Sequence, residues 1–179
     1  HEAQGKADRR RLLRALNVSL GFVLVLILCY SAQASFDWSP FAVAPHDLLR
    51  RLRQVRAAHA GETVVHCCRP SAPLPLLRAT GAGALAIDVT SATPARWESI
   101  AATLEAGTGL YAGCLPTDGS GTDQGARALV LEGFERAGLA ASSLTGLVVS
   151  PACGLAGLTQ QGARAVVRTA LDTARRLSE

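Results

Sequence analysis

Residues 84–114 read ALAIDVTSATPARWESIAATLEAGTGLYAGC, a helical pattern between two short apolar runs. Thr93 is suited to cap a helix N-terminus, and Pro94 to occupy the first helical position. Four apolar residues follow at the spacing i, i+3, i+4 and i+7, namely Trp97, Ile100, Ala101 and Leu104. This spacing indicates one buried helix face, and the flanking runs are typical of strands buried in a parallel sheet. The stretch therefore predicts a strand–helix–strand unit.

The same alternation extends to both sides of this unit. Before it we expect an amphipathic helix over 45–60 and a strand over 63–68. After it we expect a helix over 124–137, a strand over 146–150 and a helix over 159–177. Alternating strands and helices with short connections indicate an α/β fold with a parallel sheet and right-handed crossovers.

The number of strands favours part of a barrel. Four strands, or five with an apolar run near the N-terminus, correspond to the last four or five units of a (β/α)₈ barrel of the TIM type. The chain has 179 residues, whereas a complete barrel usually needs about 250. We therefore expect an incomplete barrel, with an open parallel α/β sheet as the alternative.

Residues 1–36 differ from residues 37–179, which we assign to the partial barrel domain. Within 9–34, arginines precede the apolar run Leu20–Tyr30 and an Ala-x-Ala pattern closes the segment. This order is typical of a signal peptide, so the segment is a candidate export signal or membrane anchor. A second interpretation is an incorrectly assembled gene start. A third, which we favour, is a buried barrel strand over Phe22–Leu28.

Composition and charge argue against several classes of protein. The net charge of +4 comes from 18 basic and 14 acidic residues. The arginines alternate with Leu and Ala on helical faces, and no segment interleaves basic with aromatic residues, so we expect no nucleic-acid binding.

Five cysteines at irregular spacing do not make a disulfide framework. They favour a reducing compartment, and we expect a cytoplasmic protein.

Potential metal ligands lie at the C-terminal ends of the predicted strands. His66 and Cys68 are two residues apart on one strand, so both side chains leave the same face, while Cys67 points to the other. Asp88 ends the next strand, and Cys153 follows the last one. Barrels of the α/β type place their chemistry at this end of the strands. Two thiolates, one imidazole and one carboxylate form a suitable tetrahedral zinc set.

Three segments resemble the zinc-binding half of the cobalamin-independent methionine synthase family. His66-Cys67-Cys68 is similar to its His-x-Cys strand, Ile87-Asp88 to its Ile-Glu-Thr strand, and 150–155 (SPACGL) to its Asn-Pro-Asp-Cys-Gly-Leu segment. The order and the separations are also similar. The resemblance implies that His66, Cys68 and Cys153 hold zinc, with Asp88 where the family has Glu. It further implies methyl transfer, from 5-methyltetrahydrofolate or another donor, to a zinc-bound thiol such as homocysteine.

The chain also departs from this family. Residues 111–114 (YAGC) stand where the family has Tyr-Asp-Ile-His, so Cys114 occupies the position of the family's proton-transferring His. The Asp-Glu-Pro segment that helps the family hold the amino acid is absent. We therefore carry two hypotheses: a zinc-dependent methyltransferase-like domain, or a catalytically degenerate zinc- and thiol-binding fragment that packs with a partner. A homo-oligomer is compatible with both, and membrane contact is expected only through Leu20–Tyr30.

Overall fold

The computed structural model describes residues 44–179, which lie within one compact unit of the chain. The interpretations of residues 1–36, including the barrel strand over Phe22–Leu28 and the signal or anchor through Leu20–Tyr30, fall outside the described residues. Within 44–179, no helix combines the length and the apolar character that crossing a bilayer requires.

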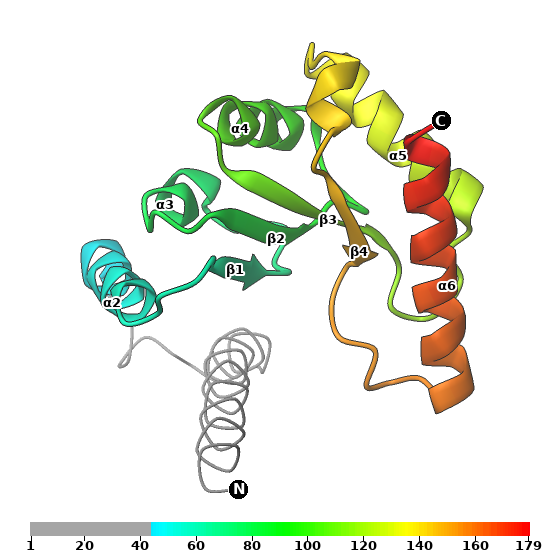
Figure 1. Ribbon diagram of the computed structural model, residues 1–179, viewed down its shortest axis with the longest axis horizontal. Helices are drawn as coiled ribbons and strands as arrows, with labels where there is room; N and C mark the ends of the chain where they lie inside the picture. The colour runs from blue at the N-terminus through cyan, green and yellow to red at the C-terminus, as the bar shows by residue number, and fades with distance from the viewer. Residues whose placement is uncertain (1–43) are drawn as a thin grey trace, which may run out of the picture. The chain divides into compact units, whose positions relative to one another are not determined.

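A four-stranded sheet forms the centre of this unit, and all of its neighbouring strands run parallel (Figure 1). The strands are β1 (Val64–Cys67), β2 (Ala84–Asp88), β3 (Gly109–Leu115) and β4 (Val148–Pro151). Their order in the sheet is the order in the sequence, β1-β2-β3-β4. The expectation of an α/β fold with a parallel sheet is therefore confirmed.

Helices precede, connect and follow these strands, and three of them begin at a threonine cap. The helices are α2 (Pro45–Ala57), α3 (Leu74–Arg78), α4 (Pro94–Glu105), α5 (Asp123–Arg136) and α6 (Gln160–Leu177), with a 3₁₀ turn, η2 (Ala141–Leu144), before β4. Thr93, Thr122 and Thr159 each accept a hydrogen bond from a backbone N–H in the first turn of the following helix. This bond satisfies one of the free donors at the helix start.

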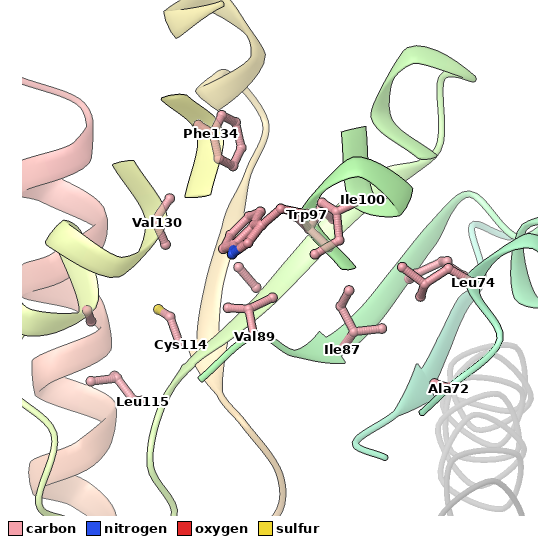
Figure 2. Close-up of a cluster of buried hydrophobic side chains, with 14 of the residues drawn as sticks. Ala72, Leu74, Ile87, Val89, Trp97, Ile100, Cys114, Leu115, Val130 and Phe134 are labelled. Carbon is pink, nitrogen blue, oxygen red and sulfur yellow. The ribbon is translucent and has the colours of Figure 1, made fainter. Parts of the chain in front are cut away.

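The hydrophobic core lies between one face of the sheet and helices α3 to α6 (Figure 2). Alternate residues of β2 and β3 project into it, such as Ile87 and Cys114. Trp97 of α4 meets Phe134 of α5 edge to face, with ring centroids 6.1 Å apart. Because successive residues of a strand point to opposite faces, the other residues of the same strands belong to the second face of the sheet.

That second face carries one continuous row of side chains across all four strands. The register aligns His66, Ala86, Tyr111 and Val148. Val148 of β4 and Val64 of β1 are each more than a third exposed. Among residues 44–179, β1 and β4 form the two edges of the sheet and do not pair with each other. The described structure is therefore consistent with the open parallel sheet, and a closed barrel is not confirmed.

Candidate metal centre

Strand β1 places two of the predicted ligands on the second face of the sheet. His66 is the third residue of β1 and pairs in register with Ala86 of β2, while Cys68 follows directly after the strand. Cys68 is 8% exposed, and His66 is half-buried. The period of two along a strand therefore places both side chains on the face away from the helical core, as the sequence predicts.

Cys153 reaches these residues from the far edge of the sheet. Neighbouring strands lie about 4.8 Å apart, so β1 and β4 would be about 14 Å apart in a flat sheet. The chain after β4 closes this distance by passing over β3, where the Ala152 N–H donates to the Leu115 carbonyl at 2.8 Å. A Cβ on Gly113 would lie only 2.7 Å from Ala152 Cα. Glycine at 113 thus makes room for the segment that carries Cys153.

Three potential ligand atoms converge as a result. Cys153 Sγ lies 3.2 Å from Cys68 Sγ and 3.9 Å from His66 Nε2. All three atoms fall within 4.8 Å of one another. In a tetrahedral zinc site with ordinary bond lengths, two sulfurs are about 3.8 Å apart, and a sulfur and a nitrogen about 3.6 Å. Shifts of up to about 1.2 Å in these separations would therefore fit the cluster around a metal ion, so the predicted set of His66, Cys68 and Cys153 is compatible with metal binding.

The environment of His66 suits a neutral imidazole. Burial lowers its pKa, and a hydrogen bond with the backbone of Ala86 opposes this effect only in part. Metal-binding histidines are neutral and commonly use their second ring nitrogen in a hydrogen bond to a backbone carbonyl or carboxylate. The pairing of β1 with β2 therefore contributes to orienting the His66 ring toward Cys153.

The Cys68 thiol is strongly disfavoured as an anion while no cation is present. Burial, together with the hydrogen bond and the charge of Cys153, raises its pKa to about 12. Two adjacent sulfurs cannot both ionise easily in a low-dielectric site. A bound metal ion reverses this preference because thiolate coordination releases the protons. Any metal binding by this cluster should therefore become tighter as the pH rises.

Asp88 does not join the three-residue cluster. Its Oδ1 accepts hydrogen bonds from the Thr90 backbone N–H at 2.8 Å and from Thr90 Oγ1 at 2.6 Å. This arrangement is a local turn in which the carboxylate satisfies backbone two residues ahead. The structure thus places Asp88 at the end of β2, as predicted, but outside the group that could hold a metal.

Cys114 lies on the other side of the sheet. It is 2% exposed and belongs to the helix-facing core with Val89 and Val130 (Figure 2). Burial raises its pKa to about 11. We therefore assign Cys114 no part in proton transfer at the cluster. Cys67 also packs against the helical core, as its place in the strand predicts.

Arg96 is a feature of this region that the sequence pattern did not single out. Its Nη1 donates to the Ala72 carbonyl, which ties the loop after Cys68 to the first turn of α4. Its Nε and Nη2 are buried without a hydrogen-bond partner among the described residues. Burial lowers the pKa of Arg96, while the charges of Cys67 and Asp88 oppose this. One signal in the sequence could have pointed to Arg96: it is an arginine in the first turn of the helix that closely follows Asp88.

Comparison with protein-family models and with curated proteins found no match for this chain.

Proposed function

We propose that His66, Cys68 and Cys153 bind a zinc ion. The observation that carries this proposal is their convergence from two separate segments to within 4.8 Å. Two soft thiolates and one imidazole favour zinc over magnesium or calcium, which prefer oxygen ligands. The resemblance to the methionine synthase family, which rests on sequence motifs, points to the same three residues.

Three protein ligands leave one position of a tetrahedral metal open, the arrangement of catalytic rather than structural zinc sites. We propose that an external thiol takes this position. Zinc would lower the pKa of that thiol, so that the bound sulfur is a thiolate near neutral pH. The protein's own part is to orient the His66 ring through Ala86, to bring Cys153 across Gly113, and to hold the loop after Cys68 through Arg96.

The reaction we propose is methyl transfer to such a thiol, with homocysteine as the acceptor and 5-methyltetrahydrofolate or a related compound as the donor. The sulfur forms a bond to the methyl carbon while the bond from that carbon to the donor nitrogen breaks, and the nitrogen then takes a proton. Positioned acid catalysis of such a step is typically worth about 10²–10⁴-fold. Cys114, which stands at the position of the family's proton-transferring His, lies in the core on the other face of the sheet. We therefore expect slow methyl transfer.

We also propose that the four strands are part of a (β/α)₈ barrel. Sequential strand order, with helices α3 to α6 against one face of the sheet, is the arrangement of such a barrel. The metal centre would then lie on the inner face. The second candidate function, a degenerate zinc- and thiol-binding fragment that packs with a partner, is favoured by the placement of Cys114 and by the two sheet edges.

Metal analysis of the purified chain tests the zinc proposal. We expect about one zinc per chain, and cobalt substitution should give thiolate-to-metal charge-transfer absorption. Cys68→Ser and Cys153→Ser should each weaken or abolish this absorption. Cys67→Ser is the matched control because its thiol faces the helical core, and it should leave the spectrum unchanged. Unaltered spectra in both ligand variants would remove the proposed centre.

Thiol binding and methyl transfer are tested separately. Homocysteine should shift the cobalt spectrum if it takes the open position, whereas methionine formation from methyltetrahydrofolate should be slow or absent. Rapid turnover would contradict the view that a proton donor is missing. A cobalt spectrum that does not respond to homocysteine would favour a closed, structural metal site instead.

A further inference from the structure

We propose that Cys68 and Cys153 also form a reversible disulfide under hydrogen peroxide, and that this oxidation and metal binding exclude each other. The disulfide itself depends only on the geometry of the two thiols. Its regulatory meaning rests on the proposed metal centre. Two distinct states of one cluster would follow: a reduced state that binds metal and an oxidised state that does not.

The two sulfurs are already in contact, although 85 residues separate them in the sequence. Their distance is 3.2 Å, and a disulfide bond measures about 2.04 Å, so closure requires a movement of about 1.2 Å. Gly154 follows Cys153 directly, and among residues 44–179 neither it nor Gly157 has a neighbouring heavy atom within 4 Å of its Cβ position. The loop beyond β4 therefore has space for this movement.

The exposure of the two thiols sets the order of the reaction. Cys153 is half-buried and Cys68 is buried, so peroxide reaches Cys153 first. Its thiol and one peroxide give a sulfenic acid and one water, with two electrons passing from sulfur to peroxide. Cys68 Sγ then attacks the Cys153 sulfur, the S–O bond breaks, and the Cys68 proton joins the departing hydroxyl to leave as a second water. In sum, two thiols and one peroxide give one disulfide and two waters.

The other described thiols are poorly placed to compete. Cys114 is 2% exposed within the helical core, and Cys67 packs against that core from the opposite side of β1. Among the cysteines of residues 44–179, the pair Cys68–Cys153 is thus the one whose sulfurs meet. Oxidation would remove two of the three proposed ligands and leave only His66, which is too few to retain the ion. Conversely, bound metal would shield the thiolates from peroxide.

The experiment treats the metal-free full chain with hydrogen peroxide and counts free thiols. The sequence contains five cysteines, and the count should fall by two, then recover with dithiothreitol. Tryptic mapping should join peptide 57–78, which holds Cys67 and Cys68, to peptide 137–164, which holds Cys153. The same link should form in Cys67→Ser and be lost in Cys68→Ser. A link through Cys67, or none, would overturn the proposal.

A His66→Ala variant separates this inference from the metal proposal. It keeps both thiols, so it should form the disulfide as readily as the metal-free wild-type chain, while its affinity for zinc should fall at least tenfold. Wild-type chain loaded with zinc should resist peroxide and retain the ion until excess oxidant releases it. A disulfide without any zinc binding would refute the metal centre alone. Zinc binding with no disulfide after metal removal would refute the redox inference alone.

Discussion

Cys68 and Cys114 are both buried thiols with a raised pKa, yet they belong to opposite faces of one sheet. Cys68 meets two further potential ligand atoms. Among the described residues, Cys114 packs in the hydrophobic core, so its burial affects stability rather than the candidate metal centre. The difference arises because Cys114 lies within β3 and Cys68 directly after β1, at positions where the alternation of side-chain direction points them to opposite faces.

Alkaline pH should destabilise the fold through Cys114. Its pKa rises from 9.0 to about 11 on folding, so between these values the folded state holds a proton that the unfolded state has lost. The contribution of Cys114 to the free energy of unfolding is therefore fully present below pH 9. It is lost as the pH rises to 11, by about 2–3 kcal/mol in total. We expect Cys114→Ala to lack this component, measured as the pH dependence of the free energy of unfolding in urea.

The comparison with Cys114→Ala isolates the titration from other groups, since these contribute equally to both proteins. The cavity left by the substitution lowers stability by an amount that does not depend on pH. Parallel curves for the two proteins from pH 7 to pH 11 would show that Cys114 does not titrate in this manner.

Gly113→Ala should weaken metal binding at the proposed centre. Its new Cβ would lie 2.7 Å from Ala152 Cα and 2.8 Å from the Ile87 carbonyl oxygen, so the segment carrying Cys153 must move away. Gly154→Ala is the matched control in the same region, because no neighbouring heavy atom of the described part of the chain lies within 4 Å of that Cβ position. We expect at least a tenfold weaker zinc affinity for Gly113→Ala by competition titration, and little change for Gly154→Ala. Equal affinities would contradict the crossing of the chain over Gly113.

The sequence predicts which residues are candidate metal ligands better than it predicts how they converge. The spacing of His66 and Cys68 on a strand is enough to place both on one face. The approach of Cys153 depends on a loop that crosses Gly113, and no local pattern encodes such a contact. The sequence also suggests Asp88, because carboxylates suit zinc, but Thr90 lies two residues ahead and holds the carboxylate in a turn.

At the level of helices and strands, most of the predicted elements are present, and the deviations have local causes. The strand predicted over 146–150 begins at Val148, because Gly146 has a φ of +87° and belongs to a turn. The amphipathic helix predicted over 45–60 ends at Ala57, and none of its residues is buried within the described structure. Helical periodicity predicts α2 correctly, but it does not tell whether a partner covers the apolar face.

The packing of α4 on α5 should depend on Gly133. A Cβ at this position would fall 2.1–2.6 Å from atoms of the Trp97 indole, so the two helices could not keep their spacing. We expect Gly133→Ala to lower the free energy of unfolding by about 2–3 kcal/mol through overpacking. Gly162→Ala on α6 is the control, since its nearest contact would be an ordinary 3.4 Å and alanine favours helix. Equal melting temperatures for the two variants would show that Trp97 can move aside.

For the molecule as a whole, the sequence predicts the class of fold and not its closure. Alternating strands and helices occur in barrels and in open sheets alike, so the pattern around residues 84–114 is compatible with both. The described structure has four parallel strands with β1 and β4 at the edges. Whether further strands complete a barrel depends on pairing between distant segments, which short-range periodicity does not contain.

The two edges lead to a prediction about self-association. An edge strand presents unpaired N–H and C=O groups that can pair with another chain. Val64 on β1 and Val148 on β4 add exposed apolar side chains at these edges. We therefore expect the purified chain to form dimers or larger assemblies, measured by light scattering and sedimentation velocity.

A single charge at an edge should reduce this association. Val148→Lys places a lysine on β4, one of the devices by which natural sheets protect their edges, and should shift the distribution toward the monomer. Val167→Lys is the matched control, since it makes the same substitution at a comparably exposed residue of α6. It should leave the distribution unchanged, because it adds the same charge away from the edge. If both variants dissociate equally, net charge rather than the strand edge governs the association. If the wild-type chain is a monomer with a cooperative melt, its strand edges are already protected. That outcome would contradict the proposal that the chain forms an incomplete barrel with two open edges.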